Sequence, residues 1–437
     1  MKMKIGVTLV VMLVLISSCE KKKGDEGDNI VPPNNNGNSI PSDQILDSNG
    51  RFFDLCRDET ASEQAKHTIA VLKELLHEQD CEKAAIEMKK VYYLSLYDKD
   101  ISDLSPLEGM PRLKTFSAAT NKITDVSVLA TIPTLEDIEL HQNSISDISF
   151  VKSLPRLTKL AMPDNNLSDL SPLASASKTL KSFIAARNQI KDITPLSHLV
   201  NLEELALLSN QVSDLTPLSD LIEMKDLSLW DNEVTDIGAL RKLVKLEELN
   251  IYENKISDLS SLADMIYLKE LLANYNEIKD ITVIEKLVRL ERLELDDNKI
   301  SDVSPLQSLS NLKELRLNDN QLKDLTVLGN ADFSLTSFNA SFNEISDLTF
   351  LQKQTALEDF GMASNKIKDL SPLEGLVHLK EINLHSNLIE DVTPLKNMDS
   401  LETLYLDNNP LGSTVLKTEQ NCPTMDIASQ AVKDFCK

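Results

Sequence analysis

The feature that most constrains the fold is an asparagine that recurs every 22 residues through most of the chain. Only two intervals differ, and both are 23 residues long, from Asn165 to Asn188 and from Asn320 to Asn343. Lys99 stands where one more asparagine is expected, so the chain holds fifteen units. A period of this length predicts a solenoid in which each unit packs only against its neighbours. The asparagines are Asn121, Asn143, Asn165, Asn188, Asn210, Asn232, Asn254, Asn276, Asn298, Asn320, Asn343, Asn365, Asn387 and Asn409.

A well-formed unit shows what each repeat builds. It has the pattern Leu246-x-x-Leu249-x-Ile251-x-x-Asn254-x-Ile256. The alternation before the asparagine predicts a short strand with one buried face. The asparagine side chain can bond backbone groups of its own and adjacent turns, which predicts a buried ladder. Prolines such as Pro305 follow soon after, so we expect an extended or 3₁₀ return path.

A second ladder lies four residues after every repeat anchor except the last, where an aspartate recurs. We interpret these carboxylates as caps that accept backbone N–H groups of the following turn. The alternative is a row of cation sites, since stacked carboxylates repel and Ca²⁺ binds such oxygens. The residues are Asp103, Asp125, Asp147, Asp169, Asp192, Asp214, Asp236, Asp258, Asp280, Asp302, Asp324, Asp347, Asp369 and Asp391.

The units over residues 91–411 resemble the 22-residue leucine-rich repeats of bacterial internalins. The resemblance implies an α/β repeat solenoid, a curved horseshoe with a concave parallel β-sheet and a 3₁₀ or extended convex side. It also implies protein recognition, without identifying the ligand. Local departures are Lys99 at the first anchor and Pro163 inside a strand segment.

The first residues have the features of a secretory signal. Lys2 and Lys4 precede an apolar stretch over residues 5–16 that is short for a membrane span. The sequence then reaches Ser17-Ser18-Cys19, which resembles the bacterial lipobox. We therefore expect a lipoprotein signal peptide at 1–18 and lipidation of Cys19, with ordinary cleavage as the alternative. The resemblance predicts a lipid-anchored envelope protein, in the outer rather than the inner membrane because Glu20, not Asp, follows the cysteine.

Three segments flank the repeats. Residues 19–47 are polar and rich in Asn, Gly and Pro, which predicts a flexible tether. Residues 48–90 predict a helical N-terminal cap, with Thr60-x-x-Glu63 as a possible capping box. Residues 412–437 predict a C-terminal cap with a short helix at about 423–436.

Four cysteines besides Cys19 allow three disulfide connectivities. The two caps lie at opposite ends of a stack about 70 Å long, and a disulfide requires Cα atoms within about 7 Å. We therefore expect Cys56 to pair with Cys81 and Cys422 with Cys436. Four free thiols are the alternative, although export implies an oxidising compartment.

Charge and motif content narrow the class of function. A formal net charge of −24 without a basic patch argues against nucleic-acid binding. The histidines are scattered, and the sequence has no phosphate loop, no Gly-rich turn and no metal-spaced His/Cys cluster. We expect no enzyme activity, no cofactor and no metal, and contact with a membrane only through the lipid anchor.

A ligand site is expected on the concave face, which each repeat reaches with the residues one, two, four and six before its asparagine. The only Trp and five of the seven Tyr fall at such positions. Tyr and Trp are enriched where a partner covers them. The predicted site is an apolar strip with acidic neighbours, and it consists of Leu208, Trp230, Tyr252, Leu272, Tyr275, Asp226, Asp231, Glu248, Glu253 and Asp296.

The sequence thus predicts an envelope-anchored protein that binds a protein or peptide on its concave face, and the acidic groups there would suit a ligand with basic residues. One alternative is that exposed sheet faces tolerate aromatic residues and that the acidic groups only maintain solubility. Another is a structural envelope scaffold, or a protein that binds cell-wall glycan.

Overall fold

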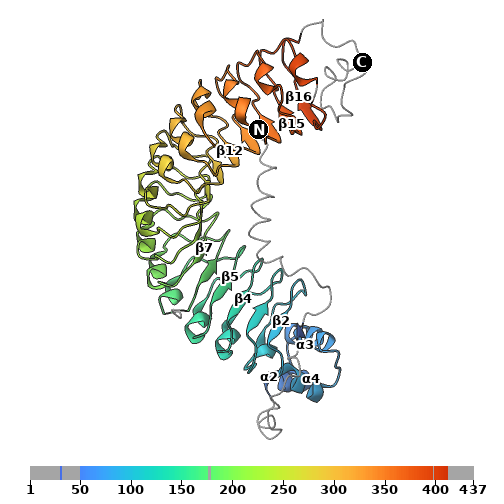
Figure 1. Cartoon of the computed structure of the whole chain (residues 1–437). Helices are drawn as coiled ribbons and strands as arrows, with labels where there is room; N and C mark the ends of the chain where they lie inside the picture. Colours follow the sequence, from blue (N-terminus) through green and yellow to red (C-terminus); the bar gives the residue numbers. More distant parts are fainter. Residues whose placement is uncertain (1–29, 32–49, 176–178, 397, 412–437) are drawn as a thin grey trace, which may run out of the picture.

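A computed structural model describes residues 30–31, 50–175, 179–396 and 398–411, which form one curved solenoid (Figure 1). Its sixteen strands lie in one sheet in sequence order. All neighbours from β2 to β16 pair in parallel, as in the pairs β8–β9 and β9–β10, whereas β1 (Ile30–Val31) pairs antiparallel with β2. The parallel strands are β2 (Tyr93–Ser95), β3 (Thr115–Ser117), β4 (Asp137–Glu139), β5 (Lys159–Ala161), β6 (Ser182–Ile184), β7 (Glu204–Ala206), β8 (Asp226–Ser228), β9 (Glu248–Asn250), β10 (Glu270–Leu272), β11 (Arg292–Glu294), β12 (Glu314–Arg316), β13 (Ser337–Asn339), β14 (Asp359–Gly361), β15 (Glu381–Asn383) and β16 (Thr403–Tyr405).

The convex side consists of 3₁₀ turns, so the predicted horseshoe fold is confirmed. A parallel strand every 22 residues and a compact return on the outside give the two layers different lengths, which curves the stack. The turns are η2 (Ser105–Leu107), η3 (Ser127–Thr131), η4 (Ser149–Ser153), η5 (Ser171–Ser175), η6 (Thr194–His198), η7 (Thr216–Leu218), η8 (Gly238–Lys242), η9 (Ser260–Leu262), η10 (Thr282–Lys286), η11 (Ser304–Ser308), η12 (Thr326–Asn330), η13 (Thr349–Lys353), η14 (Ser371–Leu373) and η15 (Thr393–Leu395).

The asparagines form the predicted ladder. The amide nitrogen of Asn232 donates to the carbonyl oxygens of Leu229 and Trp230 in its own repeat and of Leu207 in the preceding one, at 2.9 to 3.2 Å. Its amide oxygen accepts the backbone N–H of Val212 at 2.9 Å. One side chain therefore satisfies four backbone groups where the chain leaves the sheet, and it links adjacent repeats.

All fourteen aspartates of the second ladder act as caps. Each accepts the backbone N–H two residues further on at 2.7 to 2.8 Å, at the start of the 3₁₀ turn. Hydrogen bonds from the residue two further on lower the pKa of Asp147 and Asp192. In the described ranges, no three His, Cys, Asp or Glu residues lie close enough together to hold a metal ion. This geometry supports the capping interpretation rather than a row of cation sites.

Within residues 50–90, the described segment before the repeats, the chain forms the helices α2 (Arg51–Arg57), α3 (Glu63–Leu75) and α4 (Cys81–Met88). The predicted capping box at Thr60 is wrong. Ser62 caps α3 by accepting the Ala65 N–H at 3.0 Å, because Thr60 bonds Asp58 within the preceding turn.

A disulfide joins Cys56 to Cys81, with Cα atoms 5.9 Å apart, and so ties α2 to α4. The second expected pair, Cys422 and Cys436, lies outside the described residues, as do the signal peptide, Cys19 and the C-terminal cap. Among the residues that are described, no helix is both long and apolar enough to cross a membrane.

Candidate functional site

The concave face is organised in columns, because parallel strands in register place equivalent residues side by side about 4.8 Å apart. Glu204, Asp226, Glu248 and Glu270 pair in this way across β7 to β10. We call these four residues the acidic column. Arg292 of β11 ends it by pairing with Glu270.

An aromatic strip, defined as Trp230, Tyr252 and Tyr275, lies at the other ends of these strands. The rings of Trp230 and Tyr252 meet edge to face with centroids 5.3 Å apart. Those of Tyr252 and Tyr275 are tilted, 5.2 Å apart. Such contacts hold aromatic rings in fixed orientations at low entropic cost. The structure therefore brings together the three aromatic residues predicted from the sequence.

Trp230 has a second role that the sequence does not reveal. It packs against a small apolar cluster on the concave side, separate from the main core, that consists of Ala161, Ile184, Ala186, Ala206 and Leu208. Leu208 is only 1% exposed, so the expectation that it faces solvent is wrong. Trp230, the next residue in the same column, covers Leu208, so a ligand would contact Trp230 rather than Leu208.

Two polar atoms of β8 and the turn after it are buried without a hydrogen-bond partner in the described part of the chain. They are the Trp230 indole nitrogen and the Ser228 hydroxyl. An unmet buried donor costs about 1–3 kcal/mol. The centre of the concave face thus contains buried polar atoms without hydrogen bonds, whereas the asparagine side chains of the ladder beside it are hydrogen-bonded.

Tyr275 occupies a costly backbone position. The residue just before each anchor has a positive φ, which is 54° at Tyr275, 55° at Asp231 and 52° at Glu253. Bulky residues rarely adopt this conformation. Tyr275 is nevertheless 46% exposed there. Burial and the nearby Asp297 carboxylate raise the pKa of Tyr275 to about 12, so its hydroxyl stays protonated.

The acidic column is electrostatically strained. Burial and the charges of Glu248 and Glu204 raise the pKa of Asp226 to about 7. Burial and Glu248 also raise the pKa of Glu270. Asp226 and Glu270 are therefore harder to ionise than free carboxyl groups, because each lies close to other carboxylates. A cation placed over the column would relieve that repulsion.

We expect Glu248→Gln to lower the pKa of Asp226, because Glu248 is the strongest charge acting on it. A raised folded-state pKa means that the folded chain binds more protons between about pH 4 and 7, so stability falls as pH rises through that window. The free energy of unfolding of the variant, compared with that of wild type, should therefore be higher at pH 8 than at pH 5. We expect this difference to be about 1 kcal/mol after allowance for solvent screening.

Carboxyl NMR titration of Asp226 and urea unfolding at both pH values test this expectation. Glu253→Gln is the matched control, since Glu253 is not among the groups that shift Asp226. An Asp226 titration that is the same in both variants contradicts the coupling.

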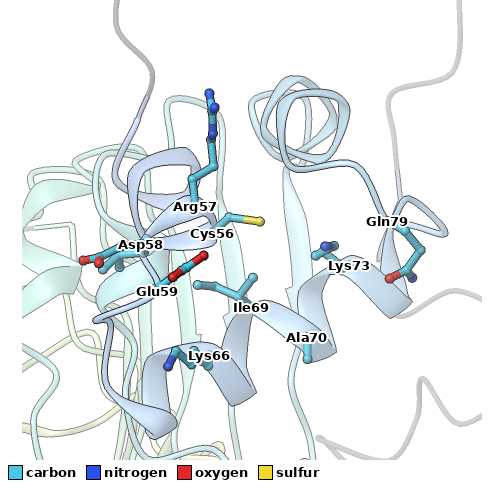
Figure 2. A pocket seen from close by; sticks show the side chains of 10 residues that line it. Cys56, Arg57, Asp58, Glu59, Lys66, Ile69, Ala70, Lys73 and Gln79 are labelled. Atoms are coloured by element: carbon cyan, nitrogen blue, oxygen red, sulfur yellow. The ribbon is translucent and has the colours of Figure 1, made fainter.

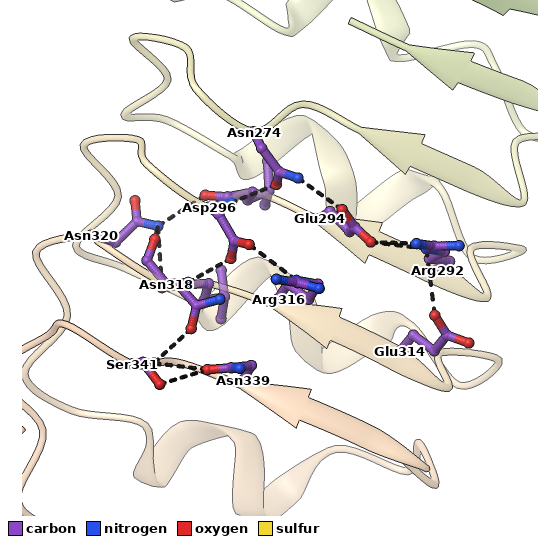
Figure 3. Close-up of polar contacts among 12 residues, drawn as sticks. Asn274, Arg292, Glu294, Asp296, Glu314, Arg316, Asn318, Asn320, Asn339 and Ser341 are labelled. Atoms are coloured by element: carbon purple, nitrogen blue, oxygen red, sulfur yellow. Dashed lines mark hydrogen bonds and ion pairs between the residues drawn. The ribbon is translucent and has the colours of Figure 1, made fainter. Parts of the chain in front are cut away.

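The remaining predicted residues differ in accessibility. Asp231 is exposed and Glu253 half-buried beside the aromatic strip, while Leu272 is half-buried on β10. Asp296 is different, because it is only 6% exposed. It accepts the Asn318 N–H at 2.7 Å and the Arg316 Nε–H at 3.0 Å (Figure 3). Asp296 is therefore part of the framework, and its prediction as an accessible acidic group is wrong.

Asp296 belongs to a polar ladder that sequence reasoning missed. In this column the side-chain oxygen of one repeat accepts the N–H of the equivalent residue in the next. Asn274 accepts from Asp296 and Asn318 from Ser341, both at 2.7 Å (Figure 3). Ser341 in turn accepts from Ala363 at 3.0 Å. The available signal was the run of short oxygen-bearing side chains two residues before successive anchors.

Beside that ladder, an ion network connects three consecutive repeats. Arg292 donates to Glu294 at 2.6 Å and lies 3.4 Å from Glu314. Asn274 donates to the other oxygen of Glu294 at 2.8 Å (Figure 3). The polar ladder and the ion network make the surface beyond β10 rigid and polar. The accessible site therefore extends from β7 to β10.

A separate cavity of about 350 Å³ lies in the N-terminal cap (Figure 2). Its lining includes Arg57, Lys66 and Lys73 together with Asp58 and Glu59. Because charges of both signs line it, this cavity defines no ligand class, and it lies away from the aromatic strip.

Curvature, sheet order and ladders together define a leucine-rich-repeat solenoid. The family model for leucine-rich repeats (two copies) matches residues 178–220, 222–264, 268–308, 288–330 and 355–397. No protein of curated function matches the sequence significantly. The chain therefore has the fold of a leucine-rich-repeat solenoid, and leucine-rich repeats are recognised over these segments.

Three solved structures show what the chain is similar to. An internalin from Listeria monocytogenes is 26% identical, with a TM-score of 0.63, over 81% of this chain and 96% of that one. A leucine-rich-repeat protein from Leptospira interrogans is 22% identical, with a TM-score of 0.65, over 77% and 95%. The plant peptide hormone receptor RGFR1, solved in complex with RGF2, is 21% identical, with a TM-score of 0.58, over 69% and 56%.

Proposed function

We propose that this protein is an envelope-anchored binding protein that holds a protein or peptide ligand on its concave face. The observation that carries the proposal is the aromatic strip, three rings in contact beside a strained acidic column. Aromatic anchors dominate binding energy when a partner covers them. The acidic column favours a ligand with lysine or arginine next to an apolar residue. The role is recognition rather than catalysis.

The anchoring part of the proposal depends on the lipobox-like Ser17-Ser18-Cys19 and the polar residues after it. Two or three acyl chains would hold the protein stably in a membrane. Because Ile30 and Val31 pair with β2, about ten residues separate Cys19 from the sheet, and a flexible coil of that length would span roughly 17 Å. We propose the outer membrane as its location. Metabolic labelling with a palmitate analogue tests lipidation, and label retained in Cys19→Ala would contradict it.

Replacing Tyr252 and Tyr275 by alanine should reduce ligand capture at least about 100-fold, because two hot-spot side chains are removed. These variants leave Trp230 over its apolar cluster, so the floor of the site stays covered. Cross-linking pull-down from intact cells measures capture.

The matched control is Phe342→Ala, which removes an exposed aromatic ring at the repeat position of Tyr275, with φ 58°, outside the strip. Equal capture by wild type and the double variant would place the ligand elsewhere. Sedimentation with purified cell-wall sacculi tests the alternative role as a glycan-binding scaffold. Sacculus binding that persists in the double variant would favour that role.

A further inference from the structure

A column of exposed aliphatic side chains lies on the rim of the solenoid, in the turn that leads into each central strand. The residues are Val200, Ile222, Val244, Ile266 and Val288, each ten before its anchor, and they are 43, 48, 39, 50 and 45% exposed. We call them the rim column. Pro133, Ser310 and Thr355 occupy this position in other repeats, and Val377 is an isolated aliphatic residue there, so consecutive aliphatic residues occur only in five central repeats.

Tyr267 widens the rim column. It is 44% exposed and lies under the Arg289 guanidinium, which is 4.7 Å from the ring centroid. Together these side chains expose on the order of 400 Å² of apolar surface, a patch size that marks interaction sites on many proteins.

Charges beside the rim column alternate in sign from repeat to repeat. The position seven residues before each anchor is occupied in turn by Lys181, Glu203, Lys225, Glu247, Lys269, Glu291 and Lys313. Glu203 contacts both neighbouring lysines at 2.6 and 2.7 Å, and Lys269 contacts Glu247 at 2.6 Å. A second pair, Lys245 and Glu223, lies closer to the rim column at 2.6 Å. This edge is therefore nearly neutral although the chain carries −24.

We propose that the rim column binds a second copy of this chain in an antiparallel, two-fold symmetric dimer. A two-fold interface requires a surface that complements itself after reversal. With the axis between the repeats of Ile222 and Val244, Ile222 meets the partner's Val244 and Val200 meets the partner's Ile266. Four of the five rim-column residues pair with aliphatic residues in this register, and Val288 lies beyond the paired segment.

The alternating charges select the same register. An axis between two repeats places every lysine opposite a glutamate. Lys225 then faces the partner's Glu247, and Glu223 faces the partner's Lys245. An axis through a repeat would place like charges opposite each other, which costs free energy. Charge complementarity therefore favours a second copy over an unrelated partner. Among the axes between repeats, the stated one is the axis that places Glu223 and Lys245 opposite each other.

The apolar area is well below the roughly 800 Å² per partner of a standard stable interface. The dimer is accordingly weak and depends on concentration. Both copies curve in the same direction in this arrangement, so the two concave faces stay open. Dimerisation is independent of the proposed ligand site.

Sedimentation equilibrium of the full chain in mild detergent, over a wide concentration range, tests the proposal. Wild type should show a monomer–dimer equilibrium. Ile222→Asp with Ile266→Asp should weaken association at least tenfold, because charges replace the facing aliphatic groups. The matched control Val377→Asp changes a side chain at the same repeat position, 51% exposed, outside the rim column, and should leave association unchanged.

A charge exchange tests the register. Lys245→Glu should weaken the dimer by placing glutamates opposite each other, and adding Glu223→Lys should restore it. The proposal is overturned by a wild-type monomer at every concentration, by equal effects of the rim and control variants, or by no restoration in the double exchange. A monomer whose binding to phosphatidylethanolamine/phosphatidylglycerol vesicles is lost with the rim variants would assign the column to a lipid surface.

Discussion

Asn276→Ala is expected to lower the free energy of unfolding by about 3 kcal/mol, although it removes only one side-chain amide. The Asn276 side chain donates to the carbonyl oxygens of Ile251, Ala273 and Asn274 at 2.9 to 3.2 Å. It accepts the N–H of Ile256 at 2.9 Å. Alanine leaves these buried groups without their partner and opens a small void between two repeats.

Because Asn276 lies in a central repeat, its loss should change the shape of the unfolding transition as well as the stability. Stability in a solenoid is nearly a sum of repeat terms and nearest-neighbour terms. Weakening one central interface should therefore allow the two halves to unfold separately. Urea unfolding should become broader, and the Ile256 amide should exchange its hydrogen faster than amides near β4.

An exposed asparagine provides the control. Asn311→Ala removes one hydrogen bond, to the Val288 carbonyl oxygen at 2.8 Å, at an exposed position. It should cost no more than about 0.5 kcal/mol. If Asn276→Ala unfolds like Asn311→Ala, the ladder does not hold the repeats together.

The fold was predictable because every repeat has the same pattern of apolar and turn-forming residues. The asparagine spacing predicts the turn and the ladder, and the Leu-x-Ile alternation predicts which face is buried. Fifteen in-phase copies exclude other periods. The cap was less predictable, because a single capping motif has no repetition to support it. The motif pointed to Thr60, but Thr60 bonds Asp58 in the preceding turn and Ser62 is the N-cap.

The candidate site was predictable at the level of columns but not of accessibility. Register alone brings Trp230, Tyr252 and Tyr275 together, and the structure places their rings in contact. Whether an outward-facing side chain reaches solvent depends on the size of its neighbours. Trp230 packs over Leu208, and side chains of adjacent strands enclose Asp296. The rim column was missed because it lies at a turn position, outside the columns to which function was assigned.

Asp296→Ala is expected to lower the free energy of unfolding by about 2–3 kcal/mol, whereas Asp296→Asn should change it by less than about 1 kcal/mol. Alanine removes the acceptor of the Asn318 N–H and the partner of Arg316. Asparagine keeps an acceptor oxygen for Asn318. Burial raises the pKa of Asp296 although Arg316 lowers it, so the desolvation cost of the charged carboxylate exceeds its attraction to the arginine.

This pair of variants also separates framework from binding surface. Asp296→Asn should capture ligand as wild type does, because the side chain is buried away from the aromatic strip. Urea unfolding measures the first effect, and the cross-linking pull-down measures the second. A large loss of stability in Asp296→Asn would mean that the charge itself stabilises the fold. If Asp296→Asn is stable but no longer captures ligand, Asp296 belongs to the ligand site. That site would then extend beyond β10, over the repeats that contain the polar ladder.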